Sequence, residues 1–401
     1  MGRLTPDHLG AVGLGSMIFS FIYWNFGFLR MGTTGITAQA FGKKDDYLIS
    51  QTLGRASVLA LIISVIILAL QFPFFEASAY LMNVQEGQEA LLLDYFKVRI
   101  WAAPATLLLY SILGWFFGMQ NAIFPMILTI VINIINIIVS WYLVHHMGME
   151  AKGVAWGTVV AQYAGVVLAL FLIAKKYPSY LSGINAQALR KIEALRGFLK
   201  VNQDLFIRTV GLTFAFGFFY SKSSEAGAMI LASNVILLQF VNWMSYGIDG
   251  FAYASEALVG KYYGAENEDK LNKAIRYSMV WGVGFALLYS LVYAFFGEAL
   301  LYLFTDDTEI ISFSMNYLWW MILFPIAGFA CYIWDGIYIG FTASKAMRDT
   351  MFIALALYLL TYYLSSTLHP MHQLWLSLSM LLFARGIVQT FLYWKYGKSL
   401  I

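Results

Sequence analysis

Charged side chains are scarce in this sequence of 401 residues. Only 12% of the residues are Asp, Glu, Lys or Arg, whereas 60% are hydrophobic. A soluble domain usually has about a quarter of its residues charged. The mean hydropathy is accordingly high, at +0.70. A water-soluble globular fold is therefore excluded, and most of the surface must face lipid.

Cysteine and the common catalytic motifs are also missing. The single cysteine, Cys331, excludes a disulfide within the chain. The sequence has no HExxH and no GxSxG motif, and its adjacent acids, Asp45-Asp46 and Asp306-Asp307, fall in predicted loops. The net charge of +3 is small and spread over loops, which gives no support for nucleic-acid binding. We therefore expect no enzyme, no metal site and no cofactor.

Long uncharged runs recur along the chain. A helix needs about 20 residues to cross the hydrocarbon core of a bilayer, and each run reaches that length. The single runs are 8–29, 56–75, 153–174, 226–248, 277–297 and 310–334. Two longer runs each hold two helices: 100–149, with a break near 118–121, and 350–384, with a break near 365–370. With one more helix between Leu199 and Tyr220, the sequence predicts an all-α membrane protein with eleven transmembrane helices.

Lysine and arginine are divided unequally between the two sets of alternating loops. One set holds 17 Lys and Arg residues, and its loops are 38–56, 119–123, 175–200, 259–276, 342–349 and 395–401. The other side holds five, which are Arg3, Lys97, Arg99, Lys152 and Lys222. Cytoplasmic loops carry the excess of Lys and Arg. The pattern predicts a multi-pass protein of the plasma (inner) membrane with a cytoplasmic C-terminus.

An internal repeat relates the two halves of the chain. Residues 11–46 and 229–267 share the same order of small residues, aromatic residues and a charged turn containing glycine. The offset is 218 at the start of the repeat and 222 at its end, where Gly42 matches Gly264. Repeats around a central cavity are a common plan of transporters. The sequence thus predicts two pseudo-symmetric lobes.

The repeat also sets the expected domain limits. We expect an N-lobe over 1–176, a cytoplasmic linker over 177–198 and a C-lobe over 199–401. The C-lobe has six predicted helices and the N-lobe five. One helix is therefore expected to be missing ahead of Met1, and a complete protein would have twelve helices with both ends in the cytoplasm.

Several short motifs lie within or next to the predicted spans. They include Phe28–Gly35, Asp204–Thr209, Asp249–Phe251, Glu256–Gly260 and Asp335–Gly340. With these motifs the chain resembles the multidrug and toxic compound extrusion (MATE) family, in its DinF-like branch. The resemblance covers nearly the whole chain.

The resemblance implies a two-lobe antiporter for multidrug efflux. It would export drug-like, often cationic, organic compounds in exchange for H⁺ or Na⁺ by alternating access, as a monomer in contact with membrane lipid. Two departures stand against it: the family's first helix, with its aspartate, is not in this sequence, and Ser140 stands where the family often has an acid. A lipid-linked glycan flippase of a related fold and a truncated, inactive transporter fragment remain alternatives.

Three acids are the candidates for ion coupling: Asp335, Asp249 and Glu256. A charge within the membrane costs at least about 2.5–3.5 kcal/mol, so it is retained for a reason. Asp249 and Glu256 are seven residues apart and share one helical face. The alternative for Asp335 is a structural salt bridge to Arg30 or Arg385.

Other polar residues are candidates for the substrate cavity or for structure. Asp204 and Arg208, spaced i and i+4 with the acid first, are expected to form a structural pair. Arg30 is expected to pair with Asp249 or Asp335 of the other lobe. The cavity candidates are the polar groups of apolar helices: Arg30, Tyr110, Asn133, Asn136 and Ser140.

Overall fold

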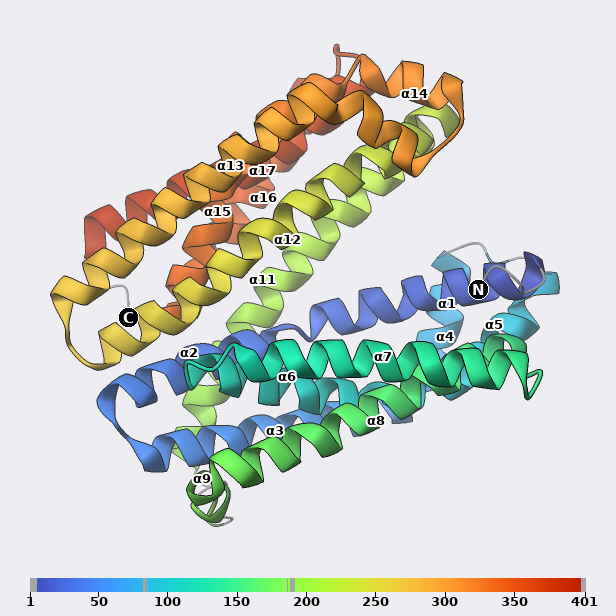
Figure 1. Ribbon diagram of the computed structural model, residues 1–401. Helices are drawn as coiled ribbons and strands as arrows, with labels where there is room; N and C mark the ends of the chain where they lie inside the picture. Colours follow the sequence, from blue (N-terminus) through green and yellow to red (C-terminus); the bar gives the residue numbers. More distant parts are fainter. Residues whose placement is uncertain (1–5, 82–83, 85, 186, 188–191, 398–401) are drawn as a thin grey trace. The chain divides into compact units, whose positions relative to one another are not determined.

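The computed structural model describes residues 6–81, 84, 86–185, 187 and 192–397. Every regular element in these ranges is a helix (Figure 1). The chain forms two compact units, 1–199 and 200–401. The described start of the segment expected as a linker packs within the first unit, where Gln51 donates a 2.8 Å hydrogen bond to the carbonyl of Gly183.

The described helices that lie wholly in the first unit end at Ser182. They are α1 (Pro6–Asn25), α2 (Phe28–Lys43), α3 (Asp46–Ala69), α4 (Gln71–Leu81), α5 (Glu86–Arg99), the 3-10 helix η1 (Ile100–Ala102), α6 (Ala103–Gly118), α7 (Ile123–His145), α8 (Glu150–Lys176) and α9 (Pro178–Ser182).

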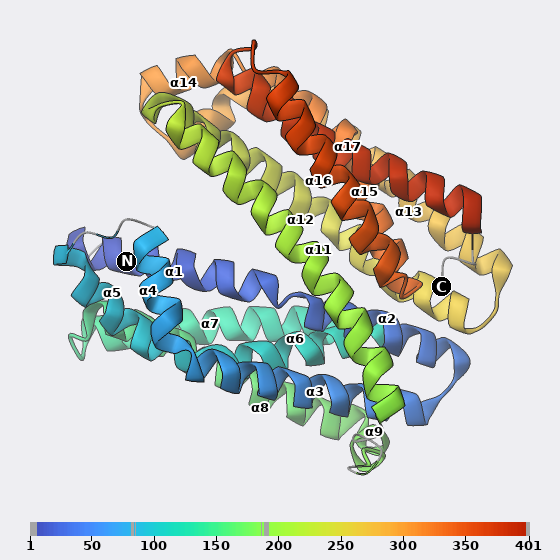
Figure 2. The ribbon, with the colours of Figure 1, turned by 180° about the vertical axis from the view of Figure 1, so that it is seen from behind.

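The remaining helices build the second unit, together with α11, which begins shortly before it. They are α11 (Ile192–Glu225), α12 (Ala228–Gly264), α13 (Glu268–Phe304), α14 (Thr308–Met315), α15 (Leu318–Gly340), α16 (Ser344–Leu364) and α17 (Pro370–Tyr396). Both ribbon views show α17 beside α15 and α16, with which it packs (Figures 1 and 2).

The described helices can be compared with the eleven membrane helices expected from the sequence. Among the described residues, nine helical segments are long and apolar enough to cross a membrane. Two of the eleven expected spans, in α11 and α16, are not among these nine, although both helices are long enough, at 34 and 21 residues. Both predicted breaks are confirmed, because α6 ends at Gly118 before α7, and α16 ends at Leu364 before α17.

Polar caps fix where several helices begin. The carboxylate of Asp45 accepts a 2.8 Å hydrogen bond from the backbone N–H of Leu48 at the start of α3. Asn267 caps α13 through the N–H of Lys270 at 3.0 Å. Such side chains satisfy backbone donors that the first turn leaves without a partner. The polar turns between apolar runs therefore set the helix boundaries.

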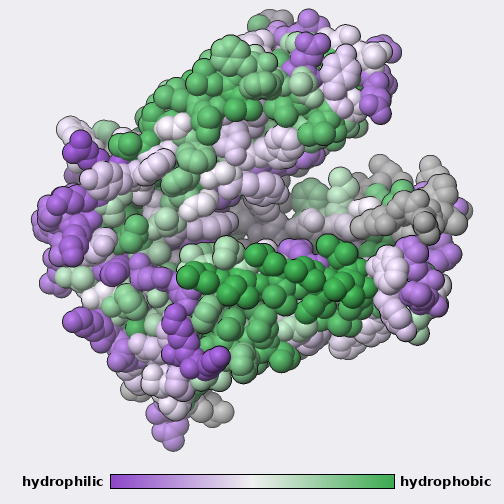
Figure 3. All heavy atoms as spheres, in the orientation of Figure 1, coloured by the Kyte–Doolittle hydropathy of each residue, from purple (hydrophilic) through white to green (hydrophobic). Residues whose placement is uncertain are grey.

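Two helices present broad apolar faces to the outside of their own units. Only 11% of the most apolar stretch of α7 is buried, and 22% of that of α13. Figure 3 shows hydrophobic side chains gathered over α7 in one unit and over α13 in the other. The exposed hydrophobic residues of α7 include Ile130, Ile134, Ile137, Ile138 and Trp141. Hydrocarbon is the solvent that tolerates such faces.

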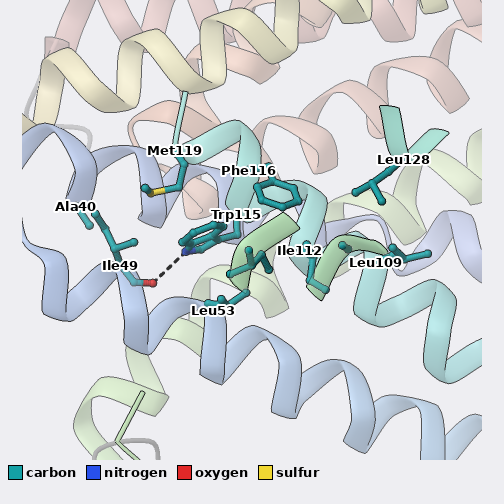
Figure 4. Packing of buried hydrophobic residues seen from close by; sticks show 11 residues of the cluster. Ala40, Ile49, Leu53, Leu109, Ile112, Trp115, Phe116, Met119 and Leu128 are labelled. Atoms are coloured by element: carbon teal, nitrogen blue, oxygen red, sulfur yellow. Dashed lines mark hydrogen bonds between the residues drawn. The ribbon is translucent and has the colours of Figure 1, made fainter. Parts of the chain in front are cut away.

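The core of the first unit is built around Trp115 of α6 (Figure 4). Its ring is fully buried, and its indole N–H donates a 3.1 Å hydrogen bond to the backbone carbonyl of Ile49 on α3. Leu53, Ile112 and Phe116 pack in the same cluster. A buried indole N–H without an acceptor would be costly, so this bond fixes the register between α3 and α6.

The internal repeat is confirmed by two close helix crossings. In the first unit, Gly114 of α6 lies against the backbone of Arg30 on α2, with no room for a Cβ atom. In the second unit, Gly336 of α15 lies in the same way against the backbone of Ala252 on α12. Both members of the second crossing follow those of the first by the repeat offset of 222 residues.

One turn further on, each crossing has a second glycine. Gly118 packs on Thr34 and Thr37 of α2, and Gly340 packs on Glu256 and Val259 of α12. These pairs are again 222 residues apart. Small residues allow membrane helices to approach closely, and the same packing is built twice.

We expect Gly336→Ala to lower the free energy of unfolding by about 1–3 kcal/mol or more, because its methyl group would overlap backbone atoms that cannot rotate away. The matched control is Gly284→Ala on α13, whose Cβ would meet no atom within 4 Å. This control should be neutral or gain up to about 1 kcal/mol in helix propensity. The unfolding midpoints of the purified variants in detergent measure both effects. Equal midpoints would contradict the close crossing.

Candidate ion-coupling and substrate site

Asp335 of α15 is held by three donors from two other helices. Its carboxylate accepts hydrogen bonds from Arg208 on α11, from Arg385 on α17 at 2.5 Å and from Gln389 on α17 at 2.9 Å. The side chains are 13% exposed for Asp335, 8% for Arg208 and 3% for Arg385. The acid thus ties α11, α15 and α17 together inside the second unit.

The spacing along α17 explains the grip on Asp335. Arg385 and Gln389 are four residues apart, so they lie one above the other on the same face. Together with Arg208 they occupy most of the acceptor sites of one carboxylate. The salt bridge to Arg385 is confirmed. A role of Asp335 in ion coupling stays a prediction, and a cation would have to displace an arginine.

Asp249 lies near this triad on α12. It is half-buried. It lies close enough to interact electrostatically with Arg208 of α11 and with Cys331 and Tyr332 of α15. We call Asp249, Asp335, Arg208 and Arg385 the charged cluster. Its two acids and two arginines cancel in formal charge, so one added cation would give the cluster a net charge of +1.

Glu256 lies two turns beyond Asp249 in the packing interface of α12. It is 2% exposed, and its carbonyl oxygen lines the close crossing with Gly340 of α15. Its position is therefore more enclosed than that of Asp249. A role of Glu256 in ion coupling stays a prediction.

The expected pair between Asp204 and Arg208 gives way to two longer-range pairs. Asp204 accepts a 2.6 Å hydrogen bond from Arg348 and a 3.1 Å bond from Ser344, both of α16. Arg208 reaches Asp335 instead. An i,i+4 pair on one helix gains only about 0.3–0.5 kcal/mol, whereas a buried acid that loses its cation costs several times more. Tertiary pairing therefore decides the partners.

The polar residues of α7 face different surroundings. Asn136 donates a 3.0 Å hydrogen bond to Thr158 of α8, whereas Asn133 is exposed and bonds within its own helix. The hydroxyl oxygen of Ser140 is buried and has no hydrogen-bond partner in the described part of the chain, where it packs against Gly157 of α8. Asn136 thus joins α7 to α8, and the role of all three in substrate binding stays a prediction.

The other two cavity candidates lie on α6 and α2. Tyr110 of α6 is half-buried, and so is Arg30 of α2, whose guanidinium lies 6.0 Å from the ring centre of Phe117. The pairing of Arg30 with an acid of the second unit stays a prediction.

Sequence reasoning missed one arginine of the first unit. Arg99 was expected in a loop, but α5, η1 and α6 form one helical segment from Gly87 to Gly118 that contains it. Pro104, five residues after Arg99, is the relevant signal in the sequence. Proline is tolerated in the first turn of a helix, and here it lies at the start of α6 without ending the helical segment that contains Arg99.

An all-helical, multi-pass chain with a repeated helix packing and buried charges is the plan expected of a membrane transporter. The MatE family profile matches residues 1–142 and 206–366, which is most of the chain. The protein belongs to this family of multidrug and toxic compound extrusion (MATE) transporters, and it is not an enzyme.

Known relatives agree with this assignment. DNA damage-inducible protein F of Escherichia coli (strain K12) is 35% identical over 390 residues, covering 96% of this chain and 83% of the relative. A probable multidrug resistance protein NorM of Bacillus cereus (strain ATCC 10987 / NRS 248) is 24% identical over 347 residues, covering 81% and 73%. A crystal structure of MATE in the bent conformation matches with a TM-score of 0.86 at 20% identity, over 98% of this chain and 88% of that one.

Proposed function

We propose that this MATE transporter is a secondary antiporter. It exports drug-like, often cationic, organic compounds in exchange for H⁺ or Na⁺ by alternating access of its two helical units. It lies in the inner membrane with its C-terminus in the cytoplasm. The observation that carries the proposal is the charged cluster of the second unit, in a family of multidrug efflux transporters.

The exchange follows from competition for one acid. Both acids of the cluster are half-buried, but the carboxylate of Asp335 is occupied by its arginines. A proton or Na⁺ at Asp249 would raise the formal charge of the cluster from zero to +1, which disfavours a cationic substrate nearby. Two ligands that exclude one another at one site are coupled reciprocally. Binding of an ion in one state of the transporter then favours release of the substrate from that state.

Transport in proteoliposomes tests the proposal. With purified protein and a fluorescent cationic dye, ethidium, we expect an outward H⁺ or Na⁺ gradient to accelerate dye uptake at least several-fold. An ionophore that collapses the effective gradient should abolish the acceleration. Dye movement that responds to neither gradient would contradict ion-coupled antiport. Empty liposomes under the same gradients correct for passive accumulation.

A further inference from the structure

Among the residues that the structure describes, no acid forms an ion pair with Arg99. Its guanidinium lies over two aromatic rings of α1, 5.2 Å from the centre of Phe19 and 5.5 Å from that of Tyr23. Within the described ranges no carboxylate pairs with it. Asp94, five residues before Arg99 on α5, binds Lys152 at 3.0 Å instead. A cation inside a membrane unit normally has such a partner.

Two hydroxyl groups converge on the same place. Tyr23 is 5% exposed and Thr106 is 6% exposed, and both Thr106 and Arg99 lie within interaction range of the Tyr23 hydroxyl. The hydroxyl oxygens of Tyr23 and Thr106 and the Nη1 atom of Arg99 are all buried, and none makes a hydrogen bond among the described residues. Three groups that can donate hydrogen bonds therefore meet here, and the guanidinium among them can only donate.

The fold brings these groups together from two directions. Thr106 lies in the first turn of α6, two helical turns after Arg99 in the same helical segment. Tyr23 comes from the end of α1, which packs against α5 in both ribbon views (Figures 1 and 2). Tyr110, a predicted cavity residue, follows Thr106 by one turn. The segment thus presents a polar stripe toward α1.

The donor set determines the chemistry of a ligand. Guanidinium has only donors, and its planar fork matches the two oxygens of a carboxylate. The aromatic rings cover the face of the guanidinium, which leaves its N–H edge for an acceptor. Arg99 as a whole is only half-buried, so part of its side chain is exposed although its Nη1 atom is covered. Buried donors without an acceptor cost free energy that a bound oxyanion would recover.

We propose that Arg99, Tyr23 and Thr106 form a binding site for the carboxylate of an amphipathic organic molecule, with Phe19 and Tyr23 as its aromatic wall. Binding at equilibrium does not depend on ion coupling. The site can therefore fail or succeed separately from the proposed antiport.

Calorimetric titration of the purified protein in a neutral detergent tests this site. The probes are 1-naphthoate and its neutral counterpart, 1-naphthamide. We expect naphthoate to bind at least about tenfold more tightly than the amide, since hydrogen bonds to a charged group are stronger than neutral ones. If naphthoate does not bind, or binds no better than the amide, the proposal is overturned.

Variants locate the binding. Arg99→Gln should weaken naphthoate binding at least about tenfold, and Tyr23→Phe should weaken it about three- to tenfold. Arg99→Lys, which keeps the charge but loses the fork, should fall between wild type and Arg99→Gln. The matched controls are Arg196→Gln and Tyr80→Phe, which change exposed side chains of the same unit and should leave the affinity unchanged.

Tyr23→Phe removes only a hydroxyl group, so this variant still tests the site if Arg99→Gln does not fold. Folding of each variant is checked by its unfolding midpoint and gel filtration. If Tyr23→Phe and any folded Arg99 variant bind naphthoate as tightly as wild type, the oxyanion lies elsewhere and the assignment is wrong.

Discussion

Asp335→Asn is expected to lower the free energy of unfolding by about 3–5 kcal/mol, the usual cost of breaking a buried ion pair from one side. The substitution keeps the shape of the side chain but removes its charge. Arg208 and Arg385, at 8% and 3% exposure, would then lie close together without the negative charge that compensates their positive charges. The unfolding midpoint in detergent measures the loss, and transport should fall with the amount of folded protein.

A second substitution separates a structural role from ion coupling. Adding Arg208→Gln to Asp335→Asn removes one excess cation, so that Asp249 and Arg385 cancel in formal charge, and part of the lost stability should return. Asp306→Asn, in an exposed loop, is the control and should have no effect. A stable Asp335→Asn protein that loses only its ion dependence would show that Asp335 carries the ion.

The membrane helices were predictable because their signal is local. A run of apolar residues long enough to cross the bilayer must form a helix, since no other open structure satisfies its backbone in lipid. The breaks after Gly118 and after Leu364 were predictable for the same reason. The helices themselves extend beyond the uncharged runs: α13 begins at Glu268, nine residues before the run that starts at Tyr277. Charged end turns outside the lipid continue a helix that the apolar run starts.

The partners of the buried charges in the second unit were less predictable, because they depend on distances in space. Asp204 and Arg208 have favourable spacing on one helix, yet each pairs with a residue at least 127 positions away. The sequence does show that these charges lie in apolar surroundings and need partners. Which partner each one reaches depends on how α11, α15, α16 and α17 pack, and no local pattern contains that information.

Asp249→Asn is expected to abolish ion-driven dye exchange, with a loss of at least about tenfold, since a neutral amide can take up neither a proton nor a bound cation near neutral pH. The triad around Asp335 stays intact in this variant, because none of its three hydrogen bonds involves Asp249. The loss of stability should therefore be small beside that of Asp335→Asn. Rates in proteoliposomes, divided by the amount of folded protein, measure the effect.

Glu256→Gln is the matched comparison on the same helical face. Its side chain lies deeper in the interface between α12 and α15, so its replacement should affect stability more than ion dependence. If exchange survives in Asp249→Asn and is lost in a folded Glu256→Gln protein, the coupling acid is Glu256. The two acids differ in burial along one helix, and an acid that must exchange its ion with water needs the less enclosed place.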